Sequence, residues 1–354
     1  MDGTSLRWSA LVLAAALTPW WGGIGAAANL DDPALSPEVL GDHLADLTAQ
    51  IEERAGLVGY YDFEYLTDNK GDSPSHFRQH HVSLFVSRSW TSWRVFSEIE
   101  FENAPVYAGD GGTVGGNGEL KVETAWAEYL HAEWLHVRGG KLLLPQYWNV
   151  NHYPNVVLST ERPLMVRALY PADTTGLMAY GTAYVGQLGT TYHLYYGNGQ
   201  SADRSHTDDN EGKEVGGQLT FHLDQLVDGV ARMNVGIGAM SDPTATDHND
   251  VYGLDTQINA GRYELLAEYA KRASDASGEG FYVQPSARVW REVRCFYRYE
   301  FTDFENAPRQ ERHTLGVNFR PQPDVSLKLE VNTNDFSDAT ESYEEVAASV
   351  AIFF

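Results

Sequence analysis

The chain has 354 residues, a single cysteine and a formal net charge of −24 at pH 7. One cysteine excludes an intramolecular disulfide framework and a cysteine-rich zinc site. The acidic balance makes nucleic acid a poor partner, because an acidic surface repels phosphate. The abundance of tyrosine (20), tryptophan (9) and glycine (33) is typical of an aromatic-girdled barrel and unusual for a cytosolic α/β enzyme.

The N-terminus has the pattern of an export signal. Arg7 precedes an apolar run over 8–17, Pro19 breaks the run, and three alanines at 26–28 offer a cleavage site. The run is shorter than the roughly 20 apolar residues that a membrane-spanning helix needs. We therefore expect residues 1–28 to be a cleaved signal peptide and the mature protein to be exported.

Residues 29–56 are expected to form a periplasmic leader. Apolar residues recur at spacings of three and four from Leu40 to Ile51, which predicts a short helix over 38–54. Two interpretations of this helix stay open. It is either a spacer that leads into the first strand, or a coil that trimerises the protein or plugs its periplasmic side.

From residue 57 to 354 the hydrophobic period is two, as in β-strands. The expected strands are 57–68, 80–89, 93–104, 119–130, 134–146, 176–185, 189–198, 213–223, 231–241, 251–259, 262–272, 280–288, 291–302, 311–320, 326–334 and 343–354. About ten residues is the length that a tilted strand needs to cross a bilayer, and an even number returns both ends to one side. We predict an all-β fold, a closed antiparallel transmembrane β-barrel of about 16 strands over 57–354.

The connections between these strands alternate in length. Short ones are expected near 91–92, 131–133, 186–188, 260–261 and 289–290, and long polar ones near 69–79, 105–118, 147–175, 199–212, 242–250, 273–279 and 303–310. Short periplasmic turns and long outer loops characterise outer-membrane barrels, whereas a soluble sandwich has no reason for such asymmetry. Trp90, Trp93, Trp134 and Trp290 flank the short turns, where an interfacial aromatic belt is expected.

The expected last strand ends in Phe354, and a terminal phenylalanine after an alternating strand resembles the signal read by the barrel-insertion machinery. The expected strand 280–288 is the weakest of the set. It contains Pro285, which a sheet tolerates only at an edge or a bulge.

The connection 147–175 is much longer than usual and is rich in aromatic and apolar residues, from Tyr147 and Trp148 to the run at 156–158. Loops of such length usually carry a function. A barrel of this size has an interior wide enough to need filling. We therefore expect this third outer loop to fold into the lumen and narrow the pore.

The stretch GKLLLP at 140–145, Glu161-Arg162-Pro163, Pro171 and GLMAYG at 176–181 resemble the phosphate-selective porin O and P family. The resemblance covers about 40 residues. It implies a sixteen-stranded homotrimeric porin of the outer membrane whose third loop folds into the lumen. Anion-selective members of that family line the pore with arginines and lysines. This chain has few lysines, and its inward positions carry both signs of charge.

The candidate constriction residues lie on this loop: Arg162 and Arg167 as the charges, Glu161 and Asp173 as their counter-charges, and His152. Alternation predicts further residues lining the pore, namely Arg138, Arg294, Arg298, Arg312, Arg320, Lys328, Glu98 and Glu100. Walls of opposite charge would set a transverse field across the pore. Alternatively these charges form salt bridges that hold the wall, and Arg162 and Arg167 anchor the loop to it. Both interpretations stay open.

The leading functional hypothesis is passive diffusion of small hydrophilic solutes or ions through a barrel in outer-membrane lipid, with no cofactor. A barrel enzyme is disfavoured because the histidines are scattered and no Gly-x-Ser-x-Gly turn occurs. His80 and His81 are expected on opposite faces of one strand, so no metal site is predicted. The alternative to a porin is a plugged or structural outer-membrane barrel that anchors or sheaths a partner protein.

Overall fold

The computed structural model describes residues 58–70, 74–103, 118–199, 210–243, 248–274, 277–338 and 342–354. The expected signal peptide 1–28 and the leader 29–56 with its helix lie outside the described residues. In the described ranges, no helix combines the length and the apolar character needed to cross a membrane.

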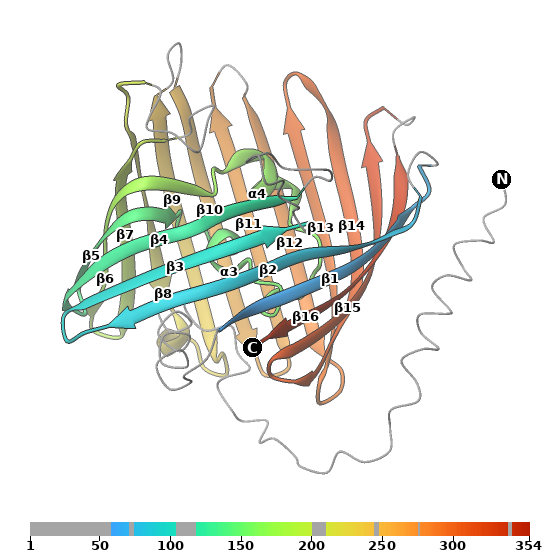
Figure 1. The fold of residues 1–354 in the computed structure, drawn as a ribbon, viewed down its shortest axis with the longest axis horizontal. Helices are drawn as coiled ribbons and strands as arrows, with labels where there is room; N and C mark the ends of the chain where they lie inside the picture. Colours follow the sequence, from blue (N-terminus) through green and yellow to red (C-terminus); the bar gives the residue numbers. More distant parts are fainter. Residues whose placement is uncertain are drawn as a thin grey trace, which may run out of the picture. The chain divides into compact units, whose positions relative to one another are not determined.

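Within these ranges sixteen antiparallel strands form a closed barrel (Figure 1), which confirms the predicted fold class. The strands are β1 Val58–Asp68, β2 His76–Ser89, β3 Trp93–Glu102, β4 Glu119–Ala132, β5 Leu135–Leu143, β6 Asp173–Val185, β7 Leu188–Gly197, β8 Glu214–His222, β9 Arg232–Pro243, β10 His248–Ala260, β11 Tyr263–Ala273, β12 Gly278–Arg288, β13 Val293–Phe304, β14 Ala307–Gln322, β15 Val325–Phe336 and β16 Tyr343–Phe353. Two short α-helices, α3 Tyr147–Asn151 and α4 Leu164–Leu169, lie between β5 and β6, and a 3-10 helix, η2, covers Asp224–Leu226.

Closure of the barrel joins the two ends of the sheet. β1 pairs with β16, from Tyr60 opposite Phe353 to Asp68 opposite Glu345. Gly59 and Phe354 exchange backbone hydrogen bonds of 2.8 and 2.9 Å. Closure leaves no strand edge unpaired, which is the condition for a sheet to sit in hydrocarbon.

Side chains alternate between the barrel interior and the outside, as the period of two predicts. In β16 the inward Ala347 and Ala351 are fully buried, while the outward Ile352 is 38% exposed. The four tryptophans next to short turns are all exposed on the outside: Trp90, Trp93, Trp134 and Trp290. Their exposure fits an aromatic band at the short-turn end of the barrel.

Two local expectations meet different outcomes. Pro285 does lie within a strand and pairs with Leu265 of β11, while the ladder to β13 is interrupted between the Val283–Tyr299 and Ser286–Phe296 pairs. The missing proline N–H therefore falls in that interruption. The prediction of a long connection at 303–310 is wrong, because β13 and β14 continue up to a tight turn at 305–306.

Gly140 brings β5 unusually close to β4. Its φ is +139°, and a Cβ there would lie 2.2 Å from the carbonyl oxygen of Ala125. Gly186, in a turn, has a φ of +64° but open space around it. We predict that Gly140→Ala lowers the free energy of unfolding well beyond the roughly 1–2 kcal/mol that positive φ alone costs, whereas Gly186→Ala costs only that strain. Urea unfolding in detergent micelles measures both, and equal effects would contradict the close approach.

Candidate functional site: the inserted loop and the cavity beside it

Residues 144–172 connect β5 to β6 by way of the barrel interior, and Figure 1 shows this green segment with α3 and α4 inside the ring of strands. Because β6 begins at Asp173, the last three residues of the predicted loop 147–175 belong to the strand. The loop buries Trp148, Met165 and Leu169 almost completely. These apolar side chains explain why the segment packs against the wall rather than extending into solvent.

α4 and the residue after it pack against the wall at two positions that are occupied by glycine. A Cβ on Gly280 would lie 2.6 Å from the Cβ of Met165, and one on Gly253 would lie 1.8 Å from the hydroxyl of Tyr170. Glycine at these two positions therefore lets α4 approach β12, and lets Tyr170, the residue after the helix, approach β10.

Substitution at this contact tests the packing of α4. Gly280→Val is expected to displace α4 and to raise backbone amide exchange across 164–169, because the valine side chain would overlap Met165 and Leu169. The matched control is Gly238→Ala, an inward glycine of β9 whose nearest neighbour is the mobile end of Gln218. Hydrogen exchange read by mass spectrometry decides, and unchanged exchange in the Gly280 variant would refute the contact.

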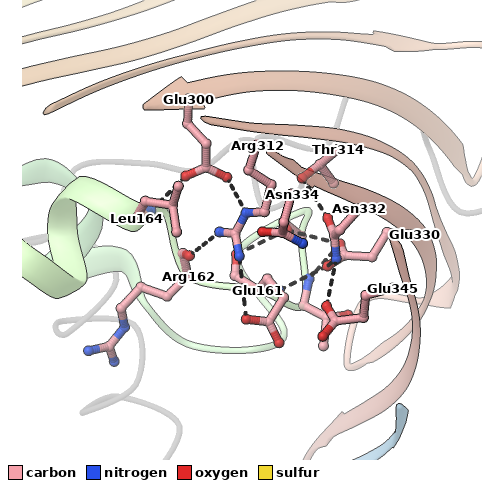
Figure 2. Close-up of polar contacts among 12 residues, drawn as sticks. Glu161, Arg162, Leu164, Glu300, Arg312, Thr314, Glu330, Asn332, Asn334 and Glu345 are labelled. Carbon is pink, nitrogen blue, oxygen red and sulfur yellow. Dashed lines mark hydrogen bonds and ion pairs between the residues drawn. The ribbon is translucent and has the colours of Figure 1, made fainter. Parts of the chain in front are cut away.

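Wall carboxylates accept hydrogen bonds from the loop (Figure 2). Glu330 accepts from the Ser159 hydroxyl and the Thr160 backbone N–H, both at 2.9 Å, and from the Glu161 N–H at 3.0 Å. Glu300 accepts from the Leu164 N–H at 2.6 Å. Such charge-assisted bonds are stronger than neutral ones. Three wall positions, counting Glu268 with the Trp148 N–H at 3.1 Å, therefore hold the loop backbone.

Wall cations bind the loop carbonyls. Every one of these donors was predicted to line the pore: Arg298 donates to the carbonyl of Glu161 at 2.9 Å, Arg312 to Arg162 at 2.6 Å, Arg320 to Val156 at 2.8 Å and Lys328 to Ser159 at 3.1 Å. Arg298 is fully buried, and Arg312 and Lys328 are each 5% exposed. Their charged ends therefore lie beneath the loop and point at its backbone.

Glu300 is the shared partner of two of these cations. Its Oε1 accepts from Arg298 Nε at 2.9 Å and from Arg312 Nε at 2.7 Å, while Oε2 holds the loop. Arg294, the remaining predicted cation of this wall, pairs with Glu264 at 2.6 Å. The arginines on β13 and β14 therefore alternate with carboxylates instead of forming one positive surface.

The two arginines of the loop itself behave differently. Arg162 and Arg167 are exposed, and their side chains make no hydrogen bond or ion pair with any residue that the structure describes. Figure 2 shows the Arg162 guanidinium directed away from the anchoring cluster. The interpretation that these two side chains tie the loop to the wall is wrong, because the wall arginines and the loop carbonyls make that attachment.

The other loop candidates occupy partnered positions. Glu161 is half-buried, with its carboxylate 3.8 Å from Arg312, and Asp173 lies 3.7 Å from Lys141 at the start of β6. The Nδ1–H of His152 donates to the carbonyl of Asn149 at 2.6 Å. Burial lowers the pKa of His152 and so disfavours its charged form.

Glu98 and Glu100 lie on β3 against the far end of the loop. Tyr153 donates to Glu98 at 3.3 Å, and Tyr60 donates to Glu100 at 2.6 Å. Both carboxylates are nearly fully buried. Contacts on β3 and on β11 to β16 show that the loop crosses the barrel interior.

A cavity of about 580 Å³ remains beside the loop, against β5 to β8. Arg138 lines it, as the sequence predicted for the pore, together with Arg94, His136, Tyr180, His193 and His222. Arg138 and Arg94 share one buried carboxylate, Glu128, at 2.8 and 3.5 Å. Glu133 and Asp224 also line the cavity, so its wall carries both signs of charge.

His193 and His222 were not among the residues predicted from the sequence to line the pore. Both lie on the inward face of the sheet, His193 on β7 and His222 on β8. The Thr191 hydroxyl and His222 Nε2 form a hydrogen bond of 2.8 Å. Alternation alone was enough to place them inward. They were overlooked because neither is part of a charged series.

The prediction that His80 and His81 face opposite sides is wrong. The β1–β2 register shifts so that Asp62 is opposite His81 and Phe63 is opposite Gln79. His80 is the extra residue of this β-bulge, and both imidazoles lie on the lumen side with their centroids 3.6 Å apart. A bulge cannot be read from alternation, because it breaks the period of two that defines the faces.

Comparison with known proteins identifies the fold. No protein-family model matches the chain. An uncharacterized protein of Aquifex aeolicus (strain VF5) is 23% identical over an alignment covering 83% of this chain and 78% of that protein.

Solved structures with the same fold are outer-membrane porins and channels. An anion-selective porin from Comamonas acidovorans has a TM-score of 0.62 and 15% identity over 84% of this chain and 99% of its own. OmpF of Salmonella typhi has a TM-score of 0.57 and 13% identity, with 84% of this chain and 97% of OmpF covered. The outer-membrane channel DcaP of Acinetobacter baumannii has a TM-score of 0.52 and 13% identity, with 84% of this chain and 96% of DcaP covered. At these identities the likeness shows a common fold, the sixteen-stranded barrel of the porins.

Proposed function

We propose that the protein is an outer-membrane diffusion channel for small hydrophilic solutes, in which loop 147–175 constricts the lumen and anionic solutes are favoured. The observation that carries the proposal is the division of the barrel interior. The loop is bound to β11–β16, and a cavity stays beside it along β5–β8. A barrel whose only role is structural has no need for an anchored loop beside a charged passage.

The exposed arginines of the loop support a preference for anions. Arg94 and Arg138 face the cavity and share Glu128, while Glu133 and Asp224 also line it. Arg162 and Arg167 are the exposed charges of the loop. Unpaired guanidinium groups on a loop that narrows a channel attract anions and repel cations. The anion-selective porin with the same fold and the resemblance to the phosphate-selective porins point in the same direction.

The same barrel fold supports the remaining parts of the proposal. We propose that the chain is exported through a cleaved signal, inserted by machinery that reads Phe354, and assembled as a homotrimer. One of the solved structures with this fold is described as a trimer form of OmpT from Vibrio cholerae. Cross-linking of the purified protein, followed by its mass in detergent, measures the number of chains.

The experiment that tests the channel is the reversal potential across a planar bilayer under a salt gradient. The wild-type protein is expected to give discrete conductance steps and an anion-favouring potential. Arg162→Ala with Arg167→Ala is expected to move the potential toward zero. The matched control removes two equally exposed charges at the short turns, Arg262→Ala with Arg291→Ala, and is expected to keep the wild-type potential.

The alternative outcomes are distinct. A cation-favouring potential keeps the channel but refutes anion preference, and would assign selectivity to the acidic residues. A folded barrel that gives no conductance steps refutes the channel and favours the plugged or structural barrel that anchors a partner protein.

A further inference from the structure

The wall next to β16, formed by β1 and β2, carries a cluster of metal-binding side chains that the proposed channel does not use. Asp62 on β1 and His80 and His81 on β2 each offer one ligand atom, and these three atoms lie within 4.8 Å of one another. We propose that this cluster is a binding site for a divalent transition-metal ion such as Zn²⁺.

The distances between the ligand atoms fit a single ion. Asp62 Oδ2 is 3.3 Å from His80 Nδ1 and 3.2 Å from His81 Nδ1, and Glu64 Oε1 is 2.9 Å from His80 Nδ1. Ligands at about 2.1 Å from a tetrahedral zinc are separated from each other by roughly 3.4 Å. Asp62, His80 and His81 therefore need only small movements to surround one ion.

The β-bulge is what brings the two histidines together. Consecutive residues of a regular strand point to opposite faces, so the register shift at Asp62 is required for both imidazoles to face the lumen. Bulges commonly direct a side chain toward a functional site. Here the bulge places both Nδ1 atoms against one carboxylate.

Asp62 supplies an independent indication of a missing ligand. It is 2% exposed, and its Oδ1 has no hydrogen-bond partner among the described residues. A buried carboxylate oxygen without a partner is costly. A cation bound between Asp62 and the histidines would compensate that carboxylate.

The surroundings of the three ligands are those of a metal site. Glu102 lies 3.7 Å from His81 Nε2, where it would orient the ring, as carboxylates commonly do for metal-bound histidine. Arg78 binds Glu64 through Oε2 at 2.6 Å and leaves Oε1 toward His80. The histidine side chains are 25% and 16% exposed, so an ion can reach them from the lumen.

The donor set also selects the class of ion. Two imidazole nitrogens with carboxylate oxygens suit zinc, nickel, copper or cobalt, whereas Ca²⁺ and Mg²⁺ take oxygen ligands. Neighbouring carboxylates are less available, because Lys121 already pairs with Glu100 at 3.0 Å and with Glu102 at 2.7 Å. The ion is therefore assigned to Asp62, His80 and His81.

The test uses full-length protein purified without a polyhistidine tag and stripped with a chelator. Zn²⁺ titrated against a chromophoric chelator is expected to bind at one ion per chain, and excess Ca²⁺ is expected not to displace it. His80→Ala and His81→Ala are each expected to weaken Zn²⁺ binding by more than about 100-fold. Removing even a residue that only hydrogen-bonds to a metal ligand lowers metal affinity by about 10–100-fold. His76→Ala is the control, because His76 lies on the same strand and, among the described residues, its side chain hydrogen-bonds only to the carbonyl of Pro74.

A spectroscopic readout keeps the test decisive if a histidine variant fails to fold. Cu²⁺ bound to the wild-type protein is expected to show hyperfine splitting from two nitrogen ligands in its electron paramagnetic resonance spectrum, and Asp62→Asn is expected to weaken its binding. Absence of a 1:1 site in the wild type, or binding that survives His80→Ala with His81→Ala, overturns the proposal. Binding needs only the folded barrel, so its failure leaves the channel proposal unaffected.

Discussion

Glu300→Ala is expected to destabilise the barrel by about 3–5 kcal/mol, the range for removing one partner of a buried ion pair. Glu300 is fully buried and is the carboxylate that Arg298 and Arg312 share. Its loss leaves two buried guanidinium groups without that partner and frees the Leu164 N–H of the loop. The measurement is the free energy of unfolding from urea titration in micelles.

Glu311→Ala is the matched control for Glu300→Ala. Glu311 is a barrel carboxylate paired with an arginine, Arg309 at 2.9 Å, but both side chains are more than a third exposed. Exposed pairs contribute only about 0.2–1 kcal/mol. Equal destabilisation by the two substitutions would show that the buried network around Glu300 does not hold the wall.

Glu330→Ala is expected to release the middle of the loop and to increase single-channel conductance. Three donors, from Ser159, Thr160 and Glu161, lose their common acceptor. Each hydrogen bond to a charged group contributes about 1.5–3 kcal/mol. Amide exchange at 160–161 should therefore accelerate by more than about tenfold, because 1.4 kcal/mol corresponds to a factor of ten in local opening.

Two measurements separate the possible results for Glu330→Ala. Faster exchange with higher conductance supports a loop that constricts the passage. Faster exchange with unchanged conductance means that the loop is anchored as described but does not limit flow. The control Glu292→Gln removes an exposed carboxylate near a short turn and is expected to leave both measurements unchanged.

The sequence was sufficient for the fold because the relevant signal is local. Alternation over about ten residues marks each strand and its inward face, as at Arg298, Arg312 and Glu330, and closure follows from the need to pair every backbone group. The apolar composition of the loop was enough to predict that it packs inside the barrel, because Trp148, Met165 and Leu169 have to be buried somewhere.

Only the tertiary structure decided what the inward charges do. Arg298 and Arg312 have the sequence signature of pore-lining residues, yet the loop covers them. Each donates a hydrogen bond to a loop carbonyl more than a hundred positions earlier in the chain. Alternation defines a direction for each side chain but not its partner. The bulge at His80 is equally invisible in the sequence, since register depends on how two strands pair rather than on either strand alone.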